Sequence, residues 1–227
     1  MTQRFDLVSR RTFCVVGAGA AAATVAGCSP DGANGFQAAT LGYKPVPQLG
    51  TPEREPFRLP RVDMNRIPKQ YHRQFVTHSG KYRPGTIVVD VQNKHLYLIG
   101  EGKSAIRYGV GVGRAGFAWG GSARIGRKAK WPTWTPPSAM IRRQPELRKW
   151  AGGMQGGPSN PLGARALYLY RGSRDTLYRL HGTNEPLSIG QAMSSGCIRM
   201  LNKDSIDLYE RAKVGARVVV SQNGAVV

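Results

Sequence analysis

Short apolar runs separated by polar turns fill the C-terminal part of the chain, from about residue 82 onward. Residues 84–113, PGTIVVDVQNKHLYLIGEGKSAIRYGVGVG, contain three successive runs, and further runs follow at 164–170, 176–182 and 216–221. Runs of about four to eight apolar or alternating residues, bounded by Gly, Pro, Asn and Asp, are typical of β-strands. The pattern therefore predicts a mostly β domain that begins with a three-stranded meander.

One segment departs from this strand pattern. Residues 202–213, NKDSIDLYERAK, carry acidic residues in their first turn, and Asn202 is a candidate N-cap. We expect a helix here, so that the domain holds one or two short helices beside its strands.

A long segment rich in proline, tryptophan and arginine lies between the meander and the run at 164–170. It includes WPTWTPPSAMIRRQPELRKW at 131–150 and GGMQGGPSNPLG at 152–163. Loops of this length in compact domains are usually functional. We therefore expect an insertion loop that forms a lid or a wall of a substrate groove, with Trp131 and Trp134 among the substrate contacts. The alternative is a solvent-exposed loop with no role in substrate binding.

The glycines at the end of the meander match a nucleotide-binding motif literally. Gly111, Gly113 and Gly116 in GVGRAG have the G-x-G-x-x-G spacing. A dinucleotide fold needs a helix directly after these glycines and an acidic residue about twenty positions further on, and neither follows here. The glycines instead predict a strand that passes close to another backbone, or a bulge.

The first thirty residues have the layout of an export signal. Arg10 and Arg11 precede an apolar stretch at 13–27 that is rich in alanine and glycine. SRRTF resembles the twin-arginine export motif, and VAGC resembles a bacterial lipoprotein cleavage box in which Cys28 is lipidated. VVGAGAAA could also open a dinucleotide fold, but no second strand with a terminal acid follows. We therefore expect residues 1–27 to be an export signal.

Residues 28–79 are expected to form a flexible, lipid-anchored tether, because they hold Pro and Gly and lack a periodic apolar pattern. Cys28 is followed by Ser29 rather than by aspartate. By resemblance to the sorting of Gram-negative lipoproteins, this places the anchor in the outer membrane, facing the periplasm. The alternative is cleavage nearby by an ordinary signal peptidase, which would leave Cys28 as a free thiol. The folded domain is then expected over residues 80–222.

Charge narrows the choice of partner. The chain has 33 Lys and Arg against 13 Asp and Glu, a formal net charge of +20. Such a charge favours nucleic acid, a membrane surface or an anionic polymer such as a cell wall. The sequence has no RNA-binding signature, zinc-finger spacing or heptad repeat, so no nucleic-acid partner is predicted.

The cysteines and histidines suit neither a disulfide framework nor a metal site. Cys14, Cys28 and Cys197 cannot all pair with one another. A structural zinc ion needs four ligands, usually clustered in pairs. The predicted domain offers His95, His181 and one cysteine, and His95 lies inside a predicted strand, so no metal site is predicted.

The segment HGTNEPLSIGQAMSSGCIRM, residues 181–200, holds one histidine and one cysteine in a single short stretch. A buried thiol beside a structural histidine is one interpretation. However, the small residues at 194–196 would let a turn present adjacent N–H groups to one point. His181 ends a predicted strand, and a neighbouring imidazole would draw off the proton of Cys197 and leave a nucleophilic thiolate. These residues point to acyl transfer through a thioester.

The same segment resembles the active-site signature of the L,D-transpeptidase (YkuD-type) catalytic domain, in which HG-[ST] precedes S-x-G-C-[IV]-R. The resemblance extends upstream through PGTIVVDVQNKHLYL and NPLGARALYLY, over roughly residues 80–222. It implies an L,D-transpeptidase-like β-sandwich or barrel, with Cys197 as the nucleophile and His181 as its base. It also implies that the Gly182 carbonyl orients the imidazole and that the N–H groups of Gly196 and Cys197 form the oxyanion hole.

Substrate contacts follow from the same motif and from the insertion. Arg199 matches the motif arginine and is expected to hold a substrate carboxylate or to brace the loop. Many family members carry histidine where this chain has Ser195, which leaves His181 as the only histidine of the motif. The expected substrate-binding residues are Arg199, Ser194, Ser195, Thr183, Asn184, Trp131 and Trp134.

The family acts on peptidoglycan, so the resemblance implies peptidoglycan stem peptides as partners. The cysteine would attack the diaminopimelate carbonyl of a tetrapeptide stem, release D-alanine and hold the stem as a thioester. An amine of a second stem would then form a 3→3 cross-link, and an amine of an outer-membrane protein would attach that protein to the wall. Attack by water would make the enzyme an L,D-carboxypeptidase, and a catalytically weak peptidoglycan-binding module is the remaining alternative. No cofactor is expected.

Overall fold

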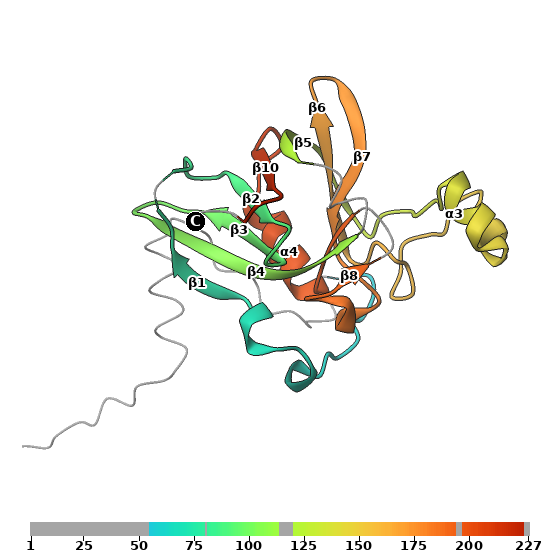
Figure 1. Cartoon of the computed structure of the whole chain (residues 1–227). Coiled ribbons are helices and arrows are strands. Elements are labelled where there is room, and N and C mark those ends of the chain that lie inside the picture. The colour runs from blue at the N-terminus through green and yellow to red at the C-terminus, as the bar shows by residue number, and fades with distance from the viewer. Residues whose placement is uncertain (1–54, 80, 114–119, 194–196, 225–227) are drawn as a thin grey trace, which may run out of the picture.

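The computed structural model describes residues 55–79, 81–113, 120–193 and 197–224, and these residues confirm the predicted mostly β class (Figure 1). The strands are β1 (Gln74–Thr77), β2 (Ile87–Asp90), β3 (His95–Ile99), β4 (Ser104–Gly113), β5 (Gly121–Lys130), β6 (Arg165–Arg171), β7 (Arg174–His181), β8 (Ala192–Met193), β9 (Ile198–Met200) and β10 (Arg217–Ser221). The helices are α3 (Ser138–Arg143) and α4 (Asn202–Arg211), with 3₁₀ turns η1 (Met64–Arg66), η2 (Lys69–Tyr71), η3 (Pro145–Trp150) and η4 (Pro186–Ser188).

Eight of the strands close into a barrel. Their order is β4-β3-β2-β10-β5-β6-β7-β9, and a pairing between β9 and β4 completes the ring. Strand β10 is parallel to β2, and β9 is parallel to β7, whereas the other ring pairs are antiparallel. Strands β1 and β8 pair with β4 outside the ring. Closure pairs the strand edges that an open sheet would leave exposed.

Apolar side chains at alternate positions of the strands fill the interior of the barrel. Tyr108, Val110 and Val112 of β4 are fully buried in one cluster with Leu180 of β7 and Ile198 of β9. Because successive side chains of a strand point to opposite faces of the sheet, the residues between these positions face outward. The polar side chains of β7 and β9 therefore lie on the outer face of the barrel.

Strand β5 lies in the segment that the sequence pattern assigns to the insertion. Among its residues, GSARIGRKAK, only Ala123 and Ile125 are buried. Arginine and lysine occupy several of the other positions, so the sequence does not show the apolar alternation that predicts a strand. The insertion proper begins after β5 and contains α3 and η3, which project away from the barrel in Figure 1.

Residues 55–79 pack on the barrel, although the sequence pattern predicts a flexible tether there. Ile67 is buried in a cluster with Ile189 and Leu201, and strand β1 pairs with β4. These contacts are made by isolated apolar residues and one short strand. Their apolar positions therefore show no helical or strand periodicity in the sequence. The predicted boundary at residue 80 is therefore corrected: the folded part includes residues 55–79.

The remaining N-terminal predictions concern residues 1–54, which lie outside the described residues. They are the export signal, the lipidated Cys28 and the first part of the tether. Within the part of the chain that the structure describes, no helix is both long enough and apolar enough to cross a membrane.

Glycines on β4 let two other segments lie directly on the barrel. A Cβ atom at Gly109 would lie 2.5 Å from the Cβ atom of Tyr71, and one at Gly111 would lie 2.6 Å from the Ser188 carbonyl oxygen. Both distances are too short for a side chain to be tolerated. The close backbone approach predicted for Gly111 is confirmed, whereas Gly116 lies outside the described residues.

A buried ionic network ties the N-terminal segment to helix α4. Asp207 accepts hydrogen bonds from Tyr108 Oη at 2.6 Å and from Arg211 Nε at 3.0 Å. Arg73 Nη1 lies 2.9 Å from Asp207 Oδ1, and Arg73 Nε lies 3.9 Å from Asp204 Oδ1. Burial raises the pKa of Asp204 to about 7, and the charge of Arg73 opposes this rise. Asp204 is thus a buried carboxyl group that holds its proton more tightly than it would in water.

This pKa predicts that the contribution of Asp204 to the stability of the fold declines between about pH 4 and about pH 7, whereas the lowered pKa of His181 acts in the opposite direction. The folded state keeps the proton on Asp204 above the ordinary pKa of 3.8, so the stabilisation is complete below that value and is lost as the pH rises through about 7. Asp204→Asn removes the charge and should stabilise the protein at about pH 8 by about 1–3 kcal/mol. Chemical denaturation at several pH values measures this gain. Asp63→Asn, at an exposed carboxylate, is the control, and equal pH dependence in wild type and Asp204→Asn would contradict the assignment.

Candidate active site

The parallel pairing of β7 with β9 brings His181 and Cys197 to neighbouring positions. Leu180 pairs with Ile198, and His181 pairs with Arg199, while Cys197 directly precedes β9. Leu180 and Ile198 belong to the cluster inside the barrel, so the residues on either side of them point outward. The histidine, the cysteine and the arginine therefore share one outer face.

The imidazole of His181 is buried and held in one orientation. Its Nδ1 lies 2.6 Å from the carbonyl oxygen of Gly182, which is the contact that the motif implies. Because a carbonyl oxygen only accepts hydrogen bonds, Nδ1 carries the proton, and Nε2 of the neutral ring keeps its lone pair. Burial lowers the pKa of His181 to about 4, although the hydrogen bond to Gly182 favours the charged ring. At neutral pH, His181 is therefore an uncharged base.

The thiol of Cys197 is half-buried. Burial raises its pKa above the ordinary value, while a hydrogen bond with the backbone of Arg179 and the positive charges of Arg179 and Arg199 act in the opposite direction. The resting pair is thus a neutral thiol beside a neutral imidazole, not the thiolate that the sequence alone suggests. A thiol in this state can act as a nucleophile only if its proton is removed during the attack.

Asn202 holds the turn that follows His181, a role that the sequence pattern does not predict. Its side-chain oxygen accepts hydrogen bonds from the N–H groups of Ala164 at 2.9 Å and Thr183 at 3.2 Å, and its amide donates to the Thr183 carbonyl at 2.9 Å. The predicted N-cap role of Asn202 is wrong, because the cap position is Leu201, without a side-chain hydrogen bond. Asparagine at the start of a helix usually indicates an N-cap, so the sequence does not reveal that this side chain bonds the backbone of another segment.

Asn202→Ala is expected to destabilise the protein by about 2–4 kcal/mol, because it removes three hydrogen bonds to backbone groups. Thermal denaturation measures the loss. Asn184→Ala removes one exposed hydrogen bond, to the Ser159 carbonyl, and should cost less than about 1 kcal/mol. Similar losses in the two variants would contradict the role given to Asn202.

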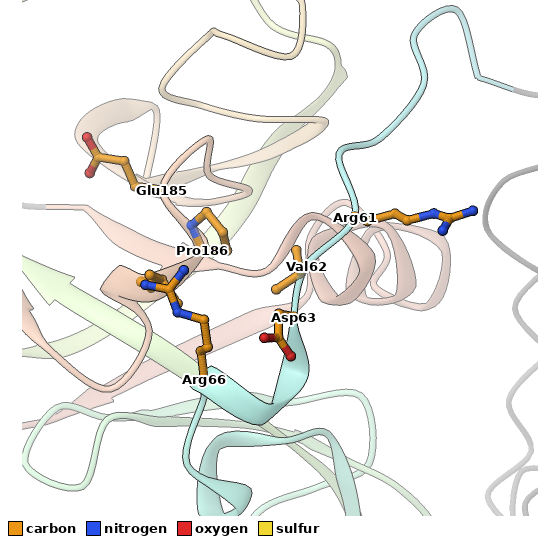
Figure 2. A pocket seen from close by; sticks show the side chains of 7 residues that line it. Arg61, Val62, Asp63, Arg66, Glu185 and Pro186 are labelled. Atoms are coloured by element: carbon orange, nitrogen blue, oxygen red, sulfur yellow. The ribbon is translucent and has the colours of Figure 1, made fainter.

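A pocket of about 430 Å³ is lined in part by Glu185, which forms an ion pair with Arg199 (Figure 2). The N-terminal segment and the loop around η4 line it, with Arg61, Val62, Asp63, Arg66, Glu185, Pro186 and Leu187. In Figure 2, Arg66 extends toward Pro186, whereas Arg61 points away. Glu185 Oε2 accepts a hydrogen bond from Arg199 Nη1 at 2.6 Å. Of the two roles expected for Arg199, this ion pair favours bracing of the loop.

The other residues of the motif lie in the turn after His181 or outside the described residues. Thr183 is buried, and its hydroxyl accepts a hydrogen bond from the Glu185 N–H at 3.0 Å. Asn184 is exposed and donates to the Ser159 carbonyl at 3.1 Å, which links the turn to the insertion. Outside the described residues lie Ser194, Ser195, Gly196 and Cys28, whose roles stay predictions.

The two tryptophans that were expected to contact substrate have different surroundings. Trp131 is 9% exposed, donates its indole N–H to Glu55 at 2.7 Å and packs edge-on against Phe57. Its ring packs against the N-terminal segment, and its substrate contact stays a prediction. Trp134 is half-buried and pairs through its backbone with Met154, and its substrate contact stays a prediction.

Among the described residues, no group of three or more His, Cys, Asp or Glu side chains could hold a metal ion. What the outer face offers is a thiol, an uncharged base with a fixed tautomer and a nearby pocket. This combination suits nucleophilic attack on a carbonyl carbon with formation of a covalent intermediate.

Comparison with known proteins identifies the family to which the chain belongs. The model of the L,D-transpeptidase catalytic domain (YkuD) matches residues 84–220, more than half of the chain. Probable L,D-transpeptidase YbiS from Escherichia coli is 34% identical over 163 residues, covering 67% of this chain and 47% of that protein. Probable L,D-transpeptidase ErfK/SrfK from Escherichia coli is 34% identical over 140 residues, covering 59% and 43%. The chain thus spans about half the length of the curated relatives it matches.

One solved structure is similar in sequence and carries a different name. It is described as a probable carnitine operon oxidoreductase from Brucella melitensis. It is 45% identical, with 70% of this chain and 99% of that chain covered, and its TM-score is 0.49. That name describes the Brucella protein, and the family of the present chain rests on the matching family model.

Proposed function

The chain belongs to the L,D-transpeptidase catalytic domain family, and on this premise we propose that it is a peptidoglycan L,D-transpeptidase working through a thioester on Cys197. One observation supports the proposal most directly. The buried, uncharged imidazole of His181, bonded to the Gly182 carbonyl, lies on the strand beside the cysteine. Such a base can accept the thiol proton during attack without a preformed ion pair.

In the proposed first half-reaction, Sγ of Cys197 attacks the diaminopimelate carbonyl carbon of a tetrapeptide stem while Nε2 of His181 takes the thiol proton. The new C–S bond replaces the amide C–N bond, and the imidazolium returns the proton to the departing amine of D-alanine. Negative charge on the carbonyl oxygen would be stabilised by the N–H groups of Gly196 and Cys197, as the family motif implies. The stem is left as a thioester.

In the proposed second half-reaction, an amine of another stem attacks the thioester. A C–N bond forms, the C–S bond breaks, and the proton of the amine passes through His181 to the leaving sulfur. The pocket beside Glu185 is the proposed entry for this acceptor, since it adjoins the ion pair with Arg199. An amine of an outer-membrane protein or a water molecule could replace the stem amine, giving attachment to the wall or L,D-carboxypeptidase activity.

A catalytically weak peptidoglycan-binding module is the second candidate. The observation in its favour is Ser195, where many family members carry histidine. Loss of that side chain removes one group that could assist proton transfer, but it leaves the proposed nucleophile and base in place. We therefore favour the enzyme.

We further propose that the mature protein is periplasmic and anchored in the outer membrane through Cys28. This rests on the twin-arginine and lipoprotein-like stretches of the first thirty residues. Labelled palmitate should be incorporated into the wild-type protein in cells and not into Cys28→Ala. Absence of label in the wild type would contradict the anchor and leave the enzymatic proposal intact.

Two mass measurements test the proposed enzyme. A carbapenem should add once to the wild-type protein and not to Cys197→Ala. Muropeptides incubated with the protein should contain cross-linked stems if an amine is the acceptor, and trimmed stems if water is. Muropeptide binding with neither product, and no carbapenem adduct, would contradict the enzyme and favour the binding module.

A further inference from the structure

Three side chains on the outer face of the barrel form a row that leads to Cys197. Arg127 of β5 pairs with Tyr168 of β6, and Tyr168 pairs with Arg179 of β7. The backbone of Arg179 in turn is hydrogen-bonded to Cys197. Arg127, Tyr168 and Arg179 are called the arginine–tyrosine row below.

Both guanidinium groups of the row lie on the tyrosine ring. The guanidinium carbon of Arg127 is 3.6 Å from the ring centroid of Tyr168, and that of Arg179 is 4.3 Å from it. Because β5 and β7 flank β6, the ring lies between the two arginines, and it is 7% exposed. Stacking of this kind fixes the plane of a guanidinium and leaves its N–H edge available for another partner.

The two arginines differ in what their N–H groups bind. Arg179 donates two hydrogen bonds to the carboxylate of Asp175, at 2.7 Å and 2.9 Å. Within the described residues, Arg127 has no hydrogen-bonded acidic partner, and Asp175 acts on it only through a longer-range attraction. Arg127 is also exposed. The row therefore presents one oriented guanidinium to an incoming anion.

The spacing of the row fits a peptide that is held at Cys197. Neighbouring strands lie about 4.8 Å apart, so the backbone of Tyr168, two strands away, lies roughly 10 Å from that of Cys197. The Arg127 guanidinium stacks on the ring of this tyrosine. An extended peptide advances about 3.3–3.6 Å per residue, and a carboxylate-bearing side group adds a similar length. A hydrogen bond of about 2.8 Å closes the remaining distance.

We propose that the arginine–tyrosine row, with Arg127 as the donor, binds the carboxylate of the stem residue that precedes diaminopimelate. The inference rests on the proposed function, because it takes the thioester at Cys197 as its starting point. A planar guanidinium can form two parallel hydrogen bonds to a carboxylate. Arg199, which the motif suggests for a substrate carboxylate, is bonded to Glu185. Because Arg199 is already paired with Glu185, the arginine–tyrosine row is the proposed site that binds the substrate carboxylate.

The test compares two tetrapeptide substrates in the wild type and in Arg127→Gln. One substrate has a free carboxylate on the residue before diaminopimelate, and the other has a carboxamide there. The wild type should prefer the free carboxylate by about tenfold in kcat/KM for D-alanine release, and Arg127→Gln should distinguish the two by less than about twofold. Arg127→Lys keeps the charge without the planar fork and should recover only part of the preference.

Arg174→Gln is the matched control, because Arg174 is exposed at the opposite end of β7 from His181. It should keep the full preference of the wild type. Iodoacetamide, a small neutral reagent, should alkylate Cys197 at the same rate in all variants. An unchanged preference in Arg127→Gln would overturn this inference alone. Failure of the wild type to release D-alanine from either peptide would overturn the proposed function, and the inference with it.

Discussion

Replacing Cys197 with alanine is expected to lower D-alanine release from a tetrapeptide stem by about 10⁴-fold or more. Cys197 is the free cysteine of the described residues, and without its sulfur no thioester can form. Backbone N–H groups and substrate binding would leave only a small residual rate. Quantifying released D-alanine over time, with wild-type and variant protein at equal concentration, measures the loss.

Cys197→Ser is the matched control for this loss. The hydroxyl has a similar shape but a much higher pKa than a thiol, and a base as weak as His181 cannot compensate for that difference. The serine variant should therefore be nearly as inactive as the alanine variant, while both keep the melting temperature of the wild type within a few degrees. D-Alanine release that survives in both folded variants would show that another group is the nucleophile.

His181→Gln is expected to lower kcat/KM by about 10³-fold, within the range of about 10²–10⁴ typical of a lost general base. Burial raises the pKa of the Cys197 thiol, so in the proposed mechanism the sulfur depends on the imidazole for removal of its proton. In the wild type, activity should fall as the pH drops through about 4, where the imidazole becomes protonated. The variant should lack this acidic limb and gain activity only as the thiol itself ionises at alkaline pH.

His95→Gln provides the matched histidine control. His95 is also buried, and its Nε2 lies 3.0 Å from the Gln70 carbonyl oxygen, but it lies on β3 and not on β7. Its replacement should leave kcat/KM within about twofold of the wild type, with the acidic limb unchanged. An acidic limb that persists in His181→Gln would mean that another group titrates there, which would contradict the role of His181 as the base.

The parts of the fold that the sequence predicts are those in which neighbouring residues carry the signal. Strands β2, β3 and β4 lie within the predicted meander at 84–113, and α4 begins at the predicted residue 202. The pair of His181 and Cys197 is recognisable for the same reason, because a single segment of the chain contains both halves of the motif.

The parts that the sequence does not predict depend on contacts between distant segments. Glu55 and Arg165 are 110 positions apart, and the pairing that closes the barrel joins β4 to β9. The stacking of Arg127 on Tyr168 likewise follows from the register of β5 against β6, which no local pattern reveals.

The charge state of the site is a further property of the folded chain. From the sequence, a histidine near a cysteine suggests a thiolate. In the structure, burial lowers the pKa of His181 and raises that of Cys197, so both groups are neutral at rest. Residue types alone cannot show this, because desolvation depends on the atoms that surround each group.

The most direct test of the thioester on Cys197 is the mass of protein trapped during turnover. Wild-type protein is mixed with a tetrapeptide stem, quenched in acid and digested, and the fragment that contains Cys197 is weighed. This fragment should gain the mass of the stem without its D-alanine, and Cys197→Ala should carry no adduct. D-Alanine release with no stem bound to the protein, or with the stem bound to a different residue, would contradict the thioester.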